Sequence, residues 1–540
     1  MTPQVHLYDT TLRDGMQGEG MSLSVDEKLR VAHALDGLGV HVIEAGFPSS
    51  NPKEEALFDL LARESWDHAE IAAFGMTRRR GVAADQDPAL ALLARSFAPV
   101  CTLVGKTWAL HLEKVTKVGR EENLAMIEES VAFLVREGKR VVYDAEHFFD
   151  GYRDDPAYAL QCLRAAADAG AFNITLCDTN GSSLPGQVAG ATAGVLEVLG
   201  QSISVGIHTH DDAGCGVANA VLAVEAGARL VQGTMNGYGE RCGNADLVAI
   251  LPALQLKLGF ECLAPERLER LTETAHLIAE ICNVAADPNQ PYVGRNAFAH
   301  KGGMHVAAVT TDARTFEHLD PAAVGNRREV LVSELSGKGT VQAHATAAGL
   351  DLPDAAATSA VERLKALEHA GYQFEAADGS FDLLLRKESG DYEALFRLES
   401  FRVLVEKRAD GRVETEATIK IWVDGERYVR TAEGNGPVNA LDRALRDAIC
   451  ETYPHLRDIE LVNYKVRILD EGKGTAAVTR VLLDASDGSS TWGAIGVSEN
   501  IIEASWEALV DSLEAGMLPS RAHHSRAGRA AGSASTAPRA

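Results

Sequence analysis

Two histidines separated by one residue, His208 and His210, lie at the end of a short apolar segment, Val205–His208, that predicts a β-strand. Side chains two apart on a strand share a face, so both imidazoles are expected to point the same way. Two imidazoles and a carboxylate, such as that of Asp14, suit a divalent metal ion and leave coordination positions open for a substrate. The side-chain carbonyl of Asn244 is a further candidate ligand. For the histidine pair alone, the alternative is an ordinary surface or core position.

Charged side chains near this group extend the predicted chemistry. Arg13 precedes Asp14, and a guanidinium there can hydrogen-bond a carbonyl oxygen as it becomes an alkoxide. The alternative is a structural salt bridge to Glu44; because the two roles are compatible, we include both residues in the candidate catalytic set. Glu146 is a candidate general base, or the group that orients one, with a solvated loop carboxylate as the alternative. The pattern indicates metal-assisted chemistry at a carbonyl group.

Eight short apolar segments must position these residues. They begin between residues 5 and 230, on average about 32 residues apart, which is the length of a strand followed by a crossover helix. Ser24 and Glu27 form a capping-box sequence before the first predicted helix, and Gly39 marks its end. The eight predicted strands are Val5–Asp9, His41–Ala45, Ile71–Gly75, Val100–Val104, Arg140–Asp144, Asn173–Cys177, Val205–His208 and Leu230–Thr234.

Eight such units predict an α/β fold, a closed (β/α)₈ barrel of the TIM type. The alternative is a doubly wound open sheet, which would carry a Gly-x-Gly-x-x-Gly loop after its first strand. The loop after Asp9, TTLRDGMQGEG, lacks that spacing. In a barrel, function resides at the carboxyl ends of the strands, and the candidate residues all follow or end predicted strands. We therefore favour the barrel.

Composition narrows the class of protein. The chain has 540 residues and a formal net charge of −25, which disfavours nucleic acid as a partner. It has no apolar stretch long enough to span a membrane and no secretory signal pattern. The eight cysteines are scattered without a C-x-x-C pair, which is typical of reduced thiols. We expect a cytoplasmic protein.

The second half follows other patterns. It is helical from about Pro265, and after Leu398 the apolar period changes to two. Three extended segments and a helix, Pro437–Tyr453, are then repeated as three further extended segments and the helix Ile501–Leu513, which predicts an α+β domain built from two βββα units. The expected domains are a barrel over 1–275, helical linker subdomains over 276–390, a regulatory and dimerisation domain over 391–517 and a disordered tail over 518–540.

Five motifs carry a resemblance to a known family, the alpha-isopropylmalate, homocitrate and citramalate synthases. Two further segments, Gly105–Trp108 (GKTW) and Tyr143–Tyr152, are most similar to the citramalate synthase branch. The five motifs are Asp9–Gln17 (DTTLRDGMQ), Ile43–Pro48 (IEAGFP), Leu176–Pro185 (LCDTNGSSLP), His208–Ala228 and Asn236–Leu247 (NGYGERCGNADL).

The resemblance implies roles for individual residues. It makes Asp14, His208, His210 and Asn244 the metal ligands, and Arg13 the group that polarises a 2-oxo acid. It implies that Thr179 contacts the carboxylate of that acid and that Glu146 is catalytic. It also implies a catalytic His305, supplied by a segment beyond the barrel that reaches the partner subunit of a homodimer. Asp211, Phe316 and Ala307 depart from the pattern of many relatives.

The activity implied by the resemblance is an acyl transfer. Acetyl-CoA and pyruvate undergo a Claisen condensation, and thioester hydrolysis gives (R)-citramalate and CoA, a step toward isoleucine. The implied cofactor is a divalent cation, with zinc, manganese, cobalt and magnesium left open. The C-terminal domain is expected to sense a branched-chain amino acid. The alternatives are 2-isopropylmalate synthesis, for leucine, and a metal-dependent barrel aldolase or lyase.

Overall fold

A computed structural model describes residues 3–48, 51–200, 203–301, 303–333, 336–469 and 471–518. These residues form two compact units, one made of the described residues up to Phe298 with Leu319–Arg328, and the other of those in Ala299–His318 and from Glu329 to Leu518. The predicted disordered tail lies outside the described residues, apart from Leu518. No helix in the described ranges is both long and apolar enough to cross a membrane.

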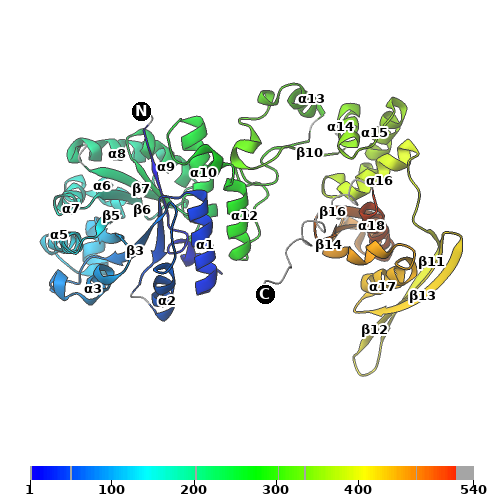
Figure 1. Ribbon diagram of the computed structural model, residues 1–540, viewed down its shortest axis with the longest axis horizontal. Coiled ribbons are helices and arrows are strands. Elements are labelled where there is room, and N and C mark those ends of the chain that lie inside the picture. The colour runs from blue at the N-terminus through cyan, green and yellow to red at the C-terminus, as the bar shows by residue number, and fades with distance from the viewer. Residues whose placement is uncertain are drawn as a thin grey trace, which may run out of the picture. The chain divides into compact units, whose positions relative to one another are not determined.

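The first unit is a closed barrel of eight parallel strands, as predicted, in the order β1 to β8 with β1 paired to β8 (Figure 1). Each predicted strand is present within two residues of its expected ends. The strands are β1 (His6–Asp9), β2 (Val42–Gly46), β3 (Glu70–Met76), β4 (Val100–Lys106), β5 (Arg140–Glu146), β6 (Asn173–Asp178), β7 (Ser204–Thr209) and β8 (Leu230–Gly233).

Helices cover the outside of this barrel (Figure 1). Helix α1 shows why the sequence folds this way: Ser24 and Glu27 form the predicted capping box, and Gly39 ends the helix at φ 96°. The helices of this unit are α1 (Val25–Leu38), α2 (Pro52–Leu61), α3 (Pro88–Arg95), α4 (Ala109–His111), α5 (Arg120–Arg136), α6 (Phe148–Asp154), α7 (Pro156–Asp168), α8 (Pro185–Leu199), α9 (Gly216–Glu225), α10 (Leu247–Pro252), α11 (Pro265–Leu268) and α12 (Leu271–Ile281).

The second unit contains the predicted pair of βββα repeats. Each repeat is an antiparallel three-stranded sheet followed by a helix, in the orders β11-β12-β13 and β14-β15-β16. Its elements are β9 (Ala299–His300), α13 (Gly303–Thr311), β10 (Glu329–Val330), α14 (Lys338–Ala347), α15 (Asp354–His369), α16 (Asp378–Ser389), β11 (Arg397–Lys407), β12 (Val413–Val423), β13 (Glu426–Gly434), α17 (Pro437–Ile449), β14 (Glu460–Ile468), β15 (Thr479–Ser486), β16 (Thr491–Ser498) and α18 (Ile501–Gly516).

Buried and more exposed residues alternate along β12, which explains why one face of the first repeat's sheet packs against the core. Thr415, Ala417, Ile419 and Ile421 are buried, as period two predicts, whereas Val413 at the strand's start is 59% exposed. Val413 pairs with Lys407 at the end of β11. Helices α14 to α16 share an apolar core with β16 through Ile495, so these helices pack as part of the second unit.

Candidate metal centre

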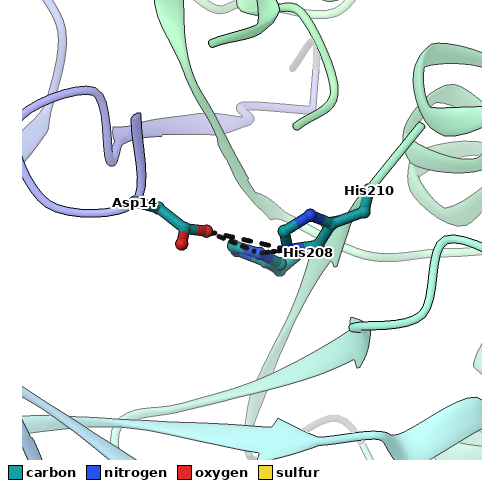
Figure 2. Close-up of side chains that lie close together, drawn as sticks. All are labelled: Asp14, His208 and His210. Atoms are coloured by element: carbon teal, nitrogen blue, oxygen red, sulfur yellow. Dashed lines mark hydrogen bonds and ion pairs between the residues drawn. The ribbon is translucent and has the colours of Figure 1, made fainter. Parts of the chain in front are cut away.

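Asp14, His208 and His210 meet at the carboxyl ends of the barrel strands. Asp14 lies in the loop after β1, His208 lies in β7, and His210 follows β7. Asp14 Oδ2 lies 3.3 Å from His208 Nε2 and 3.7 Å from His210 Nε2, and the two Nε2 atoms are 3.3 Å apart. Figure 2 shows the carboxylate directed at both rings. Each residue offers one ligand atom to a common point, which is the arrangement a divalent cation requires.

The surrounding charges favour the metal-binding forms of Asp14 and His210, whereas, against the effect of burial, the hydrogen bond and the charge of Asp14 raise the pKa of His208. Burial alone would raise the pKa of Asp14, but the Arg13 guanidinium and the two imidazoles outweigh it and hold that pKa well below its usual range. Burial and the neighbouring His208 lower the pKa of His210 to about 4. A carboxylate and a neutral imidazole are the forms that coordinate metal.

Asn244 supplies an oxygen that lacks a protein partner. Its Oδ1 is buried and accepts no hydrogen bond among the described residues, while its Nδ2 donates to Tyr238 O at 3.2 Å. The backbone of Asn244 pairs with that of His210. A buried carbonyl oxygen without a donor is uncommon in folded proteins, and a cation beside His210 would satisfy it. The donor set therefore fits a divalent metal ion.

Arg13 forms the salt bridge that the sequence left open, and it also adjoins the metal centre. Its Nε donates to Glu44 Oε1 at 2.5 Å, and its NH1 lies 3.0 Å from Asp14 Oδ1. The Phe74 ring lies under the guanidinium, with Cζ 4.1 Å from the ring centre. Tyr8 OH donates to the other oxygen of Glu44 at 2.8 Å. The guanidinium is thereby held in one position at the barrel mouth.

Glu146 ends β5, and its carboxylate pairs with Lys106, which ends β4. The Glu146 side chain is 22% exposed, so it is not the fully solvated loop carboxylate of the alternative interpretation. Thr107 Oγ1 donates to the backbone oxygen of Glu146 at 2.6 Å. Thr179, after β6, accepts a hydrogen bond from the backbone of His147 at 3.0 Å. These bonds join the ends of three neighbouring strands.

Two further residues of interest are His305 and Asp211. His305 belongs to α13 of the second unit, where its ring stacks on Phe316 with centroids 4.1 Å apart. Its catalytic role stays a prediction. Asp211 follows the ligand candidate His210, and its Oδ1 accepts a hydrogen bond from Gly216 N at 2.6 Å at the start of α9.

Sequence reasoning missed three polar residues of the barrel interior. Lys106 pairs with Glu146, and its signal was the GKTW motif at the end of β4. Asp144 lies two residues before Glu146 and therefore faces the same side of β5. Gln232 lies in β8 and bonds to both Asp144 and His208. Nothing in the local sequence around Gln232 indicates these contacts.

The fold and the site together define a (β/α)₈-barrel protein with a candidate divalent-metal centre at the mouth of the barrel. The chain matches the HMGL-like family over residues 4–278, the homocitrate synthase post-HMGL domain-like family over 292–371 and the LeuA allosteric (dimerisation) domain over 375–517. The chain belongs to the HMGL-like family.

Curated relatives match along nearly the whole chain. An (R)-citramalate synthase of Synechocystis sp. is 48% identical over 95% of this chain and 96% of its own length. One from Aquifex aeolicus is 46% identical over 95% of this chain and 98% of its own. A probable 2-isopropylmalate synthase of Methanopyrus kandleri is 34% identical over 94% of this chain and 98% of its own.

Proposed function

We propose that this chain is an acyltransferase that condenses acetyl-CoA with pyruvate and releases (R)-citramalate and CoA, a step in isoleucine formation. The observation that carries the reaction class is the Asp14–His208–His210 cluster beside a fixed arginine at the barrel mouth. The choice of pyruvate rests on the (R)-citramalate synthases that are 46–48% identical over about 95% of the chain.

The proposed chemistry divides among these side chains. Asp14, His208, His210 and Asn244 would hold the divalent cation; two imidazoles with oxygen ligands suit zinc, manganese or cobalt. When bound, that cation supplies a Lewis acid for the carbonyl of the 2-oxo acid. Arg13, held by Glu44, donates to the same oxygen as negative charge develops on it. Thr179 binds the carboxylate of the acid through its hydroxyl group.

Glu146 serves as the general base in this proposal. It takes a proton from the methyl group of acetyl-CoA, and the resulting carbon nucleophile bonds to C2 of pyruvate. The carbonyl electron pair moves to the oxygen, which is then protonated to a hydroxyl. Water next cleaves the thioester, and CoA leaves as a thiol. The assistance of His305 in these proton transfers is part of the proposal.

A panel of 2-oxo acids with acetyl-CoA, followed by free thiol release, tests this proposal. We expect the highest kcat/KM with pyruvate. A higher value with 2-oxoisovalerate would favour the second candidate, 2-isopropylmalate synthesis, for which the 34% identical relative is the supporting observation. Cleavage of a hydroxyacyl-CoA without any condensation would instead favour a barrel lyase.

We also propose that the second unit dimerises and senses isoleucine. Every second residue of the edge strand β14 has an exposed apolar side chain, and a second copy of the chain can cover this row. The four residues are Val462, Tyr464, Val466 and Ile468. A cavity of about 470 Å³ lies between β14 and the start of α17. Leu461, Val462 and Leu483 give this cavity an apolar side, and Asn435, Asn439 and Asp442 supply polar side chains, a combination that an aliphatic amino acid requires.

A further inference from the structure

We infer that Gln232 is a positioning residue of the metal centre: its side-chain amide fixes the protonated nitrogen of His208, so that the other ring nitrogen is presented to the metal. This inference rests on the metal site of the proposed function. It adds a residue that contacts neither the substrate nor the metal and acts through His208.

Gln232 is fully buried in the barrel interior, and its two amide atoms face different partners. Its Oε1 lies 2.8 Å from His208 Nδ1. Its Nε2 donates to Asp144 Oδ1 at 2.8 Å and lies 3.4 Å from Thr175 Oγ1. The chain of contacts therefore crosses three strands, from β7 through β8 to β5.

Asp144 determines which way the amide of Gln232 points. Burial, together with the charge of Glu44, raises the pKa of Asp144 to about 7. Both the ionised and the neutral carboxyl keep an oxygen that accepts a hydrogen bond, and only the Nε2 end of the amide can donate one. If the amide were reversed, its oxygen would face an oxygen of the ionised Asp144 carboxylate, and neither atom could donate a hydrogen bond. With Asp144 ionised, the oxygen of Gln232 is therefore directed at His208.

The oxygen of Gln232 in turn determines the tautomer of His208. An amide oxygen only accepts, so the short contact requires a hydrogen on Nδ1 of the ring. In the neutral imidazole, Nε2 then carries the lone pair, and Nε2 is the atom that faces Asp14 at 3.3 Å. Ligating histidines are commonly oriented through their second nitrogen in this way.

The neighbouring His210 lacks such support. Its Nδ1 is buried and has no hydrogen-bond partner among the described residues. Gln232 thus holds one of the two imidazoles, and its loss should loosen His208 while the surroundings of His210 stay as they are. Loss of a partner of this kind typically weakens metal binding about 10–100-fold.

The experiment compares metal affinity in three variants with that of the wild type. Metal-free protein is titrated with Co²⁺ against a chelator, with the visible spectrum of the bound ion as a second readout. Gln232→Met keeps the volume but removes the acceptor, and we expect it to bind Co²⁺ about 10–100-fold more weakly. Gln232→Glu keeps an oxygen at Nδ1, and since Asp144 can hold a proton between the two carboxyls, we expect binding within about threefold of the wild type.

Gln255→Met is the matched control. Gln255 lies in the same unit, and its amide bonds both backbone groups of Leu263 rather than a metal ligand, so its loss should leave Co²⁺ affinity unchanged. Equal Co²⁺ affinity of Gln232→Met and the wild type would overturn the inference and leave the proposed function standing. Wild-type protein that binds no Co²⁺ would instead overturn the proposed metal site, and the inference with it.

A measurement on the wild type covers the case in which Gln232→Met does not fold. The ¹⁵N NMR spectrum of histidine-labelled protein loaded with Zn²⁺ distinguishes the ring nitrogen that binds the metal from the one that carries a proton. We expect His208 to carry its proton on Nδ1. A proton on Nε2 in the neutral ring would contradict the inference.

Discussion

The barrel interior buries polar side chains and pairs them with one another, whereas the surface of the second unit exposes apolar side chains. Inside the barrel, Glu44, Asp144 and Gln232 are buried, and each is bonded to another polar side chain. In the second unit the sheets and their helices enclose a cluster of apolar side chains, and Val462 and Ile468 on the edge strand β14 are more than half exposed. The barrel thus fixes charge in space, and the second unit offers apolar surface to another molecule.

This difference indicates what substitutions in each unit should do. A buried charge is tolerated only when it is paired and hydrogen-bonded, so changes inside the barrel alter both chemistry and local structure. An exposed apolar surface contributes little to the fold of one chain, so changes there alter association or regulation. Substitutions in the barrel are expected to change kcat and to leave the response to the amino acid unchanged. Substitutions around α17 and β14 are expected to change that response and to leave the uninhibited kcat unchanged.

The largest effect is expected from His208→Ala. Removing one of three convergent ligands should abolish metal binding and lower kcat by about 10³-fold or more, because several kcal/mol of charge stabilisation at the alkoxide is lost. Metal content and kcat are measured together, and far-UV circular dichroism checks that the barrel is intact. Full activity in a metal-free preparation of the wild type would refute the role of the site.

Glu146→Gln should have the next largest effect. It keeps the volume but removes the carboxylate that Lys106 pairs with, and the loss of a general base typically lowers kcat about 10²–10⁴-fold. The KM for pyruvate should change little, since Glu146 acts on the acetyl group. Steady-state kinetics with each substrate varied in turn provide the measurement. An unchanged kcat would remove Glu146 from the mechanism.

These residues show how much of the site could be predicted from the sequence. The eight strands and the βββα repeats were predictable because apolar period and spacing are local signals. The meeting of Asp14 with His208 was also predictable, because a barrel brings the carboxyl ends of its strands together. The contact of Gln232 with Asp144 was not, because 88 residues separate them and no local pattern shows which side chains touch across a barrel.

A third prediction concerns Asp511 of the second unit and the pH dependence of the free energy of unfolding. It lies on α18, and burial raises its pKa to about 6, against 3.8 for an unperturbed carboxyl. The folded state therefore favours the neutral Asp511 carboxyl. The contribution of this carboxyl to the free energy of unfolding is fully present below about pH 4 and is lost as the pH rises through about 6. Asp511→Asn resembles the neutral carboxyl, so its free energy of unfolding should rise relative to the wild type by about 2 kcal/mol between these pH values. Urea unfolding at several pH values measures this, and a pH-independent difference would contradict it.

The smallest effect is expected from filling the cavity beside α17. Val438 lines it, and Val438→Trp should occupy the space that an aliphatic amino acid would need. We expect the isoleucine concentration for half-inhibition to rise at least about tenfold, equivalent to about 1.4 kcal/mol, while the uninhibited kcat stays unchanged. A point substitution is preferable to a truncation near Asp391, because α16 shares its core with β16 and would lose that cover.

Val413→Trp is the control for that experiment. Val413 is also a valine of the second unit, but it is 59% exposed and does not line the cavity, so the same substitution there should leave inhibition by isoleucine unchanged. If leucine inhibits and isoleucine does not, the cavity senses a different end product. If the wild type ignores both amino acids at saturating concentration, the second unit serves association alone. In that case the exposed strand β14, rather than the cavity, accounts for the contrast with the barrel.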